Sequence, residues 1–527
     1  MRKRNLLLAT ASGLVLAASM PKPGLWPAAW FGLVPLLIAL KGARARDAAL
    51  FGLVTGLAYY GVICFWLTIF GYLPWFLVAL KEACWLMLFA ATAAAMLPNS
   101  IGWPGYIGVP AAWTLCQWAR VIGPLGFTWG SLAHTQANVL PVIQIASVTG
   151  PWGIDFVVCL VNVALAELAS PRSREEQKQS ETSFHTPKGS SERRRLLSLA
   201  LALGLAAAVW ASGYVSFHRE LDGPAHTNVA IIQGCLPHEI NPGPEYVPAA
   251  FAAYEQMSRQ AARSHPDLIV WPETTIVDEI TETRWGPQLS ALARQTSANY
   301  VVGGYDASDD PEGRNYNSAH VFDRAGRRIG VYHKVHLVPY GEYVPFRKQM
   351  PWLERYDIRD VDVLPGKRHN LIRTDIGVIG VAICFESLFP AVCAQETRKG
   401  ANVLVIITND AWFKRTQAAR QHMMMARLRA VENRRYVVRA AATGISAIID
   451  PQGRVLRELP IYTRGVATGQ IAPRNDLTPY ARFGDWFVLA CAAGVFSVVS
   501  VRRNRQTIRT LRGVCCWFIL SPLLSAW

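Results

Sequence analysis

The chain has 527 residues and a formal net charge of +16 at pH 7, from 53 Lys and Arg against 37 Asp and Glu. Charged residues make up 17% of it and hydrophobic residues 51%, whereas soluble globular domains carry about 25% charged residues. This composition excludes an intrinsically disordered chain and a coiled coil, and 10 Cys are too few for a disulfide-framework protein. A chain with so little charge is not expected to be an ordinary soluble protein.

Apolar segments recur along the first 217 residues. A helix needs about 20 apolar residues to cross a bilayer, and the sequence predicts seven such spans here and an eighth near the C-terminus. The expected spans are 5–20, 24–40, 48–68, 74–97, 105–120, 138–168, 196–217 and 484–501. Lys81 and Glu82 in the fourth span are interpreted as an ion pair at the outer membrane edge. The stretch 226–474 contains no comparable run, so a separate domain is predicted between the last two spans.

Basic residues gather in four places, at 2–4, at 41–46, in the polar linker 170–195 and in the tail 502–527. With eight spans all four lie on one side, and the side rich in Lys and Arg is cytoplasmic. We therefore expect both termini in the cytoplasm and the domain at 226–474 outside it. A cleaved signal peptide is the less favoured interpretation of the N-terminus, because six more spans follow at once. Nucleic-acid binding is not expected, since the positive charge sits at membrane edges.

The domain at 226–474 alternates short apolar runs with amphipathic segments. This alternation predicts an α/β domain whose sheet is buried on both faces. Helices are expected at 246–263, 288–297 and 422–434. Strands are expected at 229–233, 268–271, 300–304, 318–322, 377–384 and 403–408.

Three reactive side chains follow apolar runs in this domain, namely Glu273, Lys334 and Cys384. Reactive groups in α/β domains tend to gather where strands end. A thiol becomes a nucleophile when a base accepts its proton, a carboxylate can be that base, and an ammonium can stabilise an oxyanion. Spacing alone leaves open whether the three meet, and a Cys at the end of a buried strand is by default a small hydrophobic residue.

The motifs around these residues resemble the nitrilase superfamily, with its Glu-Lys-Cys triad. They are WPET at 271–274, KVHLVPYGEYVPF at 334–346 and CFES at 384–387. Further motifs narrow the resemblance to the apolipoprotein N-acyltransferase family: GPLGFTWGSLAHTQA at 123–137, IQIASVTGPWGIDFVVCLVN at 143–162, TNDAWF at 408–413, QHMMMARLRAVENRR at 421–435 and TGISAIIDPQG at 443–453. The resemblance covers nearly the whole chain except the linker 170–195 and the end of the tail.

The resemblance implies an integral membrane α-helical bundle of about eight spans with an inserted α/β nitrilase-like α-β-β-α sandwich. It places the protein in a bacterial inner membrane, with the catalytic domain facing the periplasm. It implies that Cys384 takes an acyl chain, as a thioester, from the sn-1 position of a phospholipid, which we expect to be phosphatidylethanolamine. The acyl group would pass to the α-amine of an S-diacylglyceryl cysteine at the N-terminus of an apolipoprotein, with no cofactor and no metal.

Within that scheme Glu273 is the expected general base and Lys334 the expected oxyanion stabiliser. Glu342, Glu386, Phe385 and Trp412 are expected to be supporting residues. Phe385 stands where the family often has Tyr, so no hydroxyl is available there.

Two further departures and alternatives accompany this interpretation. Cys235 occupies a position where the family usually has Asn, so substrate contacts of its loop cannot be carried over. Cys235, Cys384 and Cys393 all lie in the domain expected outside the cytoplasm, where a disulfide to Cys384 would silence the site. The alternatives to acyl transfer are a membrane-tethered amidase or nitrilase with the same triad, and a membrane scaffold that has lost catalysis.

Overall fold

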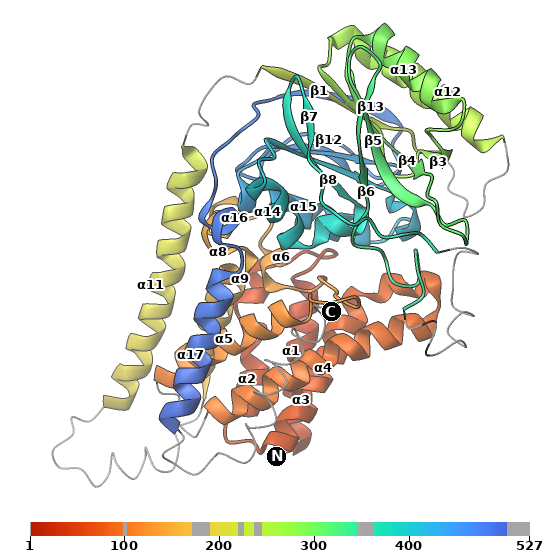
Figure 1. Ribbon diagram of the computed structural model, residues 1–527. Helices are drawn as coiled ribbons and strands as arrows, with labels where there is room; N and C mark the ends of the chain where they lie inside the picture. Colours follow the sequence, from red (N-terminus) through yellow and green to blue (C-terminus); the bar gives the residue numbers. More distant parts are fainter. Residues whose placement is uncertain are drawn as a thin grey trace, which may run out of the picture. The chain divides into compact units, whose positions relative to one another are not determined.

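The computed structural model describes residues 2–97, 103–170, 190–219, 226–236, 245–345, 347, 349 and 362–502. The chain forms two compact units, each described here by itself (Figure 1). The helical unit comprises Met1–His218 and Asp485–Trp527. The α/β unit comprises Arg219–Gly484.

The described part of the helical unit consists of α-helices and two short 3-10 helices. Its elements are α1 (Arg2–Ala18), η1 (Trp26–Trp30), α2 (Val34–Leu40), α3 (Ala45–Ile63), η2 (Phe65–Phe70), α4 (Tyr72–Met96), α5 (Trp103–Ala119), α6 (Leu132–Thr135), α7 (Leu140–Ile143), α8 (Ala146–Thr149), α9 (Pro151–Ala169), α11 (Ser190–His218) and α17 (Trp486–Arg502). Helices α3 and α4 pack backbone to backbone, because a Cβ on Gly56 would stand 2.5 Å from the Cα of Ala83. Small residues at such contacts are typical of helices that associate in membranes.

Three of the described helices are long and apolar enough to cross a membrane, at Tyr72–Met96, Pro151–Ala169 and Glu192–His218. Two expected spans are not single helices. The segment 24–40 divides into η1 and α2, and 138–168 divides into α7, α8 and α9. The second division falls at Gly150, whose φ is +67°, and Pro151, which begins α9 and disfavours a helical residue before it. The count of eight spans remains a prediction.

A buried ion pair links α4 to the segment that follows α5. Glu82 in α4 is fully buried, and its carboxylate lies 3.1 Å from the guanidinium of Arg120, which follows α5. Arg120 also donates to the carbonyls of Phe127 and Thr128, at 2.8 and 3.1 Å. The sequence interpretation of Lys81 and Glu82 as an ion pair at the membrane edge was therefore incomplete, because it omitted Arg120, 38 residues further along the chain.

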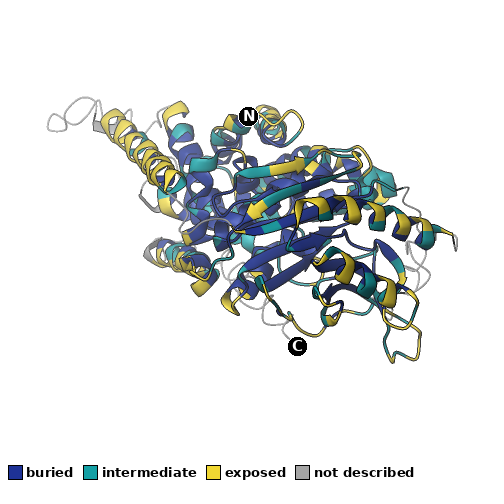
Figure 2. Ribbon diagram, turned by 90° about the horizontal axis from the view of Figure 1, so that it is seen from above, coloured by how far each residue is buried: buried dark blue, intermediate teal, exposed yellow. Residues whose placement is uncertain are grey.

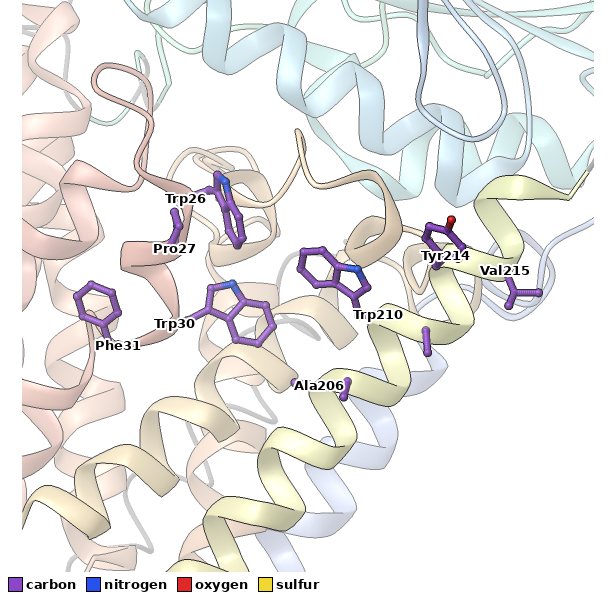
Figure 3. Close-up of a pocket in the computed structure, with 10 residues that line it drawn as sticks. Trp26, Pro27, Trp30, Phe31, Ala206, Trp210, Tyr214 and Val215 are labelled. Carbon is purple, nitrogen blue, oxygen red and sulfur yellow. The ribbon is translucent and has the colours of Figure 1, made fainter.

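An apolar cleft of about 900 Å³ lies between η1 and α11 of the helical unit (Figure 3). Its lining is almost entirely aromatic or aliphatic. Trp26, Trp30 and Phe31 form one wall, and Trp210 and Tyr214 of α11 form the other. Such a surface suits hydrocarbon better than water.

The α/β unit contains two sheets. The first has the order β13-β1-β2-β4-β5-β6, with β3 paired to β4, and the second has the order β12-β11-β10-β9-β8-β7. Its strands are β1 (Thr227–Gln233), β2 (Leu268–Val270), β3 (Ile276–Glu279), β4 (Asn299–Asp306), β5 (Tyr316–Phe322), β6 (Arg328–His333), β7 (Ile372–Thr374), β8 (Gly377–Ile383), β9 (Val403–Thr408), β10 (Val437–Ala441), β11 (Ser446–Ile449), β12 (Val455–Leu459) and β13 (Gly465–Ile471). Strands β1, β2 and β4 run parallel in the first sheet, as do β8, β9 and β10 in the second.

The two sheets share one core. Val229 and Val301 of the first sheet belong to the same buried cluster as Val381 and Val405 of the second. The alternate residues of the first sheet, such as Ile232, pack against α12 (Tyr246–Ala261) and α13 (Trp285–Thr296). Figure 2 shows strands that are largely buried and outer helix faces that are exposed.

Helices α14 (Pro390–Arg398) and α15 (Ala418–Asn433) accompany the second sheet, and α15 is buried along most of its length. The predicted α-β-β-α sandwich is thus confirmed. All six expected strands and all three expected helices are present, with ends shifted by a few residues. Strands β3, β6, β7 and β10 to β13 were not expected.

Candidate active site

Cys384 lies at the sharp turn where β8 ends and the short helix η5 (Cys384–Leu388) begins. Its φ is +51°, a conformation that costs a residue with a side chain about 1–3 kcal/mol and persists only where the surroundings impose it. Burial raises the pKa of the Cys384 thiol well above its usual value; the nearby carboxylate of Glu273 raises it further, while Lys334 opposes the shift. The resting side chain is therefore a neutral thiol that needs a base.

Glu273 and Lys334 meet although 61 residues separate them. Glu273 follows β2, Lys334 follows β6 directly, and the Lys334 ammonium lies 3.0 Å from Oε1 of Glu273. Both side chains are almost fully buried. The structure thus brings the Glu273 and Lys334 pair within electrostatic reach of the Cys384 thiol.

Glu342 is the second carboxylate at this ammonium. Its Oε1 lies 3.0 Å from Nζ of Lys334, and its Oε2 accepts a hydrogen bond from the backbone N–H of Val338 at 2.8 Å. Burial alone would lower the pKa of Lys334, but Glu273 and Glu342 outweigh it and raise the pKa above the usual value. Lys334 is therefore charged throughout the physiological range.

Asn317 of β5 is a site residue that the sequence interpretation missed. Its side-chain amide donates to Oε1 of Glu273 and to Oε1 of Glu342, each at 2.8 Å. Glu273 accepts a third hydrogen bond, besides those from Asn317 and Lys334, from the backbone N–H of Asn409, which lies 2.8 Å from its Oε2. Asn409 stands in the TNDAWF motif, whereas nothing in the sequence around Asn317 distinguished it from any other polar strand residue.

Glu386 connects the Lys334 loop to the Cys384 turn. Its Oε1 accepts from the backbone N–H of Val335 at 2.7 Å and of His336 at 3.0 Å, and from the Tyr332 hydroxyl at 2.9 Å. Its Oε2 accepts from the N–H of Ile383 at 2.8 Å. The Glu386 carboxylate thus binds the backbone next to Lys334 and the backbone next to Cys384. It therefore sets the distance between the ammonium and the thiol.

The remaining expected supporting residues lie at the margin of this cluster. Phe385 is buried and packs edge-on against Phe389, with ring centroids 5.1 Å apart. Trp412 is half-buried in η6 (Asp410–Phe413). Among the described residues Cys235, Cys384 and Cys393 are free thiols, so none of the three forms a disulfide with another.

The two histidines near Lys334 are occupied by other contacts. His333 bonds the carboxylate of Asp306 at 2.8 Å and stacks on Tyr316. His336 packs on Phe389 with ring centroids 4.1 Å apart. Among the residues that the structure describes, no group of three or more His, Cys, Asp or Glu is arranged to hold a metal ion.

Comparison with known proteins agrees with the class of protein that this fold indicates. The carbon-nitrogen hydrolase family matches residues 228–481, and the apolipoprotein N-acyltransferase N-terminal domain matches residues 12–164. The α/β unit is thus of the carbon-nitrogen hydrolase class, on a chain that also carries a second, family-specific domain.

Full-length relatives narrow the class to one family. The chain is 36% identical over 522 residues to the apolipoprotein N-acyltransferase of Geobacter metallireducens, and the alignment covers 96% of each chain. It is 30% identical over 524 residues to that of Methylococcus capsulatus, covering 95% of this chain and 97% of the relative. The chain belongs to the apolipoprotein N-acyltransferase family, acyltransferases within the carbon-nitrogen hydrolase superfamily.

A solved amidase from Nesterenkonia sp. is also similar, with 18% identity and a TM-score of 0.37, covering 48% of this chain and 92% of the amidase. The amidase alternative raised by the sequence is not supported, because the full-length relatives are apolipoprotein N-acyltransferases and the N-terminal domain of that family matches residues 12–164.

Proposed function

We propose that Cys384 is the nucleophile of an apolipoprotein N-acyltransferase, with Glu273 as general base and Lys334 as oxyanion stabiliser. The enzyme transfers an acyl chain from a phospholipid to the N-terminal amine of a lipoprotein. The observation that carries the role of each residue is the convergence of a buried carboxylate and a buried ammonium, 3.0 Å apart, beside a half-buried thiol. Glu342, Asn317 and Glu386 hold this pair in place.

In the first half-reaction the sulfur of Cys384 attacks the ester carbonyl of the phospholipid, and Glu273 takes the thiol proton. Asn317, Lys334 and Asn409 donate three hydrogen bonds to Glu273. A carboxylate has about four acceptor positions, so it retains one for that proton. The C–O bond then breaks, Glu273 returns the proton to the leaving oxygen, and a lysophospholipid departs from the acyl-thioester.

Lys334 stabilises the charge that develops during attack. An ammonium has three N–H donors, and two of them point to Glu273 and Glu342. The third is the donor that we assign to the oxyanion. A preorganised donor of this kind, in a site that excludes water, is worth far more than one in water.

In the second half-reaction the α-amine of an S-diacylglyceryl cysteine attacks the thioester carbonyl. Glu273 removes a proton from the amine, the C–S bond breaks, and the sulfur of Cys384 takes the proton back. The product is an amide, and the thioester supplies the energy, so the scheme requires no cofactor.

The donor that we propose is phosphatidylethanolamine, attacked at its sn-1 ester. We further propose eight membrane spans in a bacterial inner membrane, with both termini cytoplasmic and the α/β unit in the periplasm. Three long apolar helices support a membrane location, and the basic segments 2–4 and 41–46 support the orientation. The aromatic cleft beside α11 also fits contact with lipid chains.

Intact-mass analysis of the purified full-length protein tests the proposal. Incubation with phosphatidylethanolamine should add the mass of one acyl chain to Cys384, and a diacylglyceryl-cysteine peptide should then remove it. Cys384→Ala should gain no mass, whereas the matched variant Cys235→Ala should behave as wild type. An acyl adduct on another residue, or a peptide that leaves the adduct in place, would refute the scheme. Phosphatidylglycerol in place of phosphatidylethanolamine tests the headgroup.

A further inference from the structure

A second cluster of buried ionisable side chains lies beside the Cys384 turn. Asp410, His422 and Arg439 come from η6, α15 and β10, and all three side chains are fully buried. Oδ1 of Asp410 lies 2.9 Å from Nδ1 of His422, and its Oδ2 accepts from Arg439 at 2.8 Å. The reaction scheme above uses none of them. Buried charges are costly unless they are paired and hydrogen-bonded, so a network this complete calls for an explanation.

The network is connected to the nucleophile through Ser387. The hydroxyl of Ser387 donates to the backbone carbonyl of Cys384 at 2.7 Å and lies 2.9 Å from Nε2 of His422. On the other side, the Thr408 hydroxyl donates to Oδ1 of Asp410 at 2.8 Å and is within hydrogen-bonding reach of the Cys384 thiol. Asp410 therefore reaches Cys384 by two routes, one to its backbone and one to its sulfur.

The charge on Asp410 decides how the histidine is oriented. Burial raises the pKa of Asp410, but the contacts of this carboxylate with His422 and Arg439 outweigh burial and lower the pKa to about 2. A carboxylate only accepts hydrogen bonds, so Nδ1 of His422 carries the hydrogen that faces it. The carboxylate thereby fixes the orientation of the imidazole ring, whose Nε2 lies 2.9 Å from the Ser387 oxygen.

The backbone around the network is adapted to it. A Cβ on Gly444 would stand 2.2 Å from Oδ2 of Asp410, so only glycine leaves room for the carboxylate. Nε of Arg439 donates to the carbonyl of the next residue, Ile445, at 3.1 Å. Arg429, on the same helix as His422, donates to the carbonyl of Leu388 at 2.8 Å. Helix α15 thus holds η5 at two points.

We propose that Asp410, His422 and Ser387 form a positioning chain that holds the strained turn of Cys384 in its reactive conformation. The inference rests on the proposed role of Cys384 as nucleophile. The chain contacts no substrate; it acts on the backbone carbonyl of Cys384, whose φ of +51° persists only where neighbours impose it. Without it the turn relaxes, and the sulfur moves out of line with Glu273 and Lys334.

The test uses single-turnover thioester formation by the full-length protein with phosphatidylethanolamine vesicles. Ser387→Ala and Asp410→Asn should each lower the maximum rate by about 10- to 100-fold, because a misplacement near 1 Å can cost about 100-fold. The half-saturating phospholipid concentration should not change. The double variant should be no slower than Asp410→Asn alone, because the route through Ser387 to the Cys384 carbonyl also begins at Asp410.

Ser258→Ala is the matched control. Ser258 is a buried serine of the same unit that accepts a hydrogen bond from Trp271 at 2.9 Å and has no contact with the network. It should change the melting temperature as much as Ser387→Ala does, but leave the maximum rate within about twofold.

Alkylation of Cys384 by iodoacetamide, followed by peptide mass spectrometry, provides a readout without lipid. It should slow in Ser387→Ala and Asp410→Asn, while the buried Cys393 stays unreactive in correctly folded protein. Wild-type alkylation and thioester rates in both variants would overturn the positioning chain, as would a double variant whose losses multiply. A Cys384→Ala variant that still acquires an acyl adduct would instead overturn the proposed function.

Discussion

Glu342→Gln is the most informative single substitution at the proposed active site. The two oxygens of Glu342 accept from different donors: Oε1 from Lys334 at 3.0 Å and Asn317 at 2.8 Å, and Oε2 from the N–H of Val338 at 2.8 Å. Glutamine has the same shape but only one acceptor oxygen. In either orientation its NH₂ group faces an N–H donor, so at least one buried hydrogen bond is lost.

The magnitude follows from that lost bond. A hydrogen bond to a charged group contributes about 1.5–3 kcal/mol, and Glu342 is almost fully buried, so solvent does not compensate. If the whole loss raises the barrier to acyl-thioester formation, the rate of that step falls by about 10- to 150-fold. Part of the loss comes from Lys334, which would turn toward Glu273 and away from the developing oxyanion.

The assay is the initial rate of acyl-thioester formation, followed by intact mass, with the melting temperature measured on the same samples. Glu312→Gln is the matched control, because its side chain is 71% exposed and pairs only loosely with Arg314 at 3.4 Å. The control should retain the wild-type rate within about twofold. A Glu342→Gln enzyme as fast as Glu312→Gln would show that the second carboxylate does not organise Lys334.

Three further outcomes follow from the site. Glu386→Gln should slow thioester formation by about 5- to 150-fold. The NH₂ group of the glutamine would face the N–H of either Ile383 or Val335 and leave a buried donor unpaired, which costs about 1–3 kcal/mol. An unchanged rate in initial-rate assays would contradict the role of Glu386 in holding the two loops together. Glu273 raises the pKa of the Cys384 thiol and Lys334 lowers it. In the pH profile of Cys384 alkylation, Glu273→Gln should therefore move the midpoint to lower pH, and Lys334→Met should move it to higher pH. Shifts in the same direction would refute this electrostatic account. Lys334→Met should also lower the melting temperature more than Lys334→Arg, since removing one partner of a buried ion pair costs about 3–5 kcal/mol, and equal melting temperatures in differential scanning fluorimetry would count against it.

Local signals in the sequence were sufficient for much of the architecture. Strands β1, β8 and β9 are continuous apolar runs because both faces of each sheet are covered, one by the other sheet and one by helices. Edge strands such as β7 and β12 were missed because they are short and partly exposed, and so carry a weak pattern. The expected span at 138–168 is not one helix, because Gly150 and Pro151 interrupt it, and within it Pro151–Ala169 is long and apolar enough to cross a membrane.

What the sequence determined by itself was the alternation of the α/β unit and the family to which the motifs point, and it also supplied Glu273, Lys334 and Cys384 as the proposed triad. These depend on residue type and near neighbours, which the linear pattern contains. Tertiary structure alone decided that Asn317 bridges two carboxylates, that Glu386 ties two loops together, and that Arg120 pairs with Glu82. Each of these contacts joins segments far apart in the chain, and a hydrogen bond between distant segments leaves no periodicity in the sequence, because its geometry exists only after strands and helices have packed.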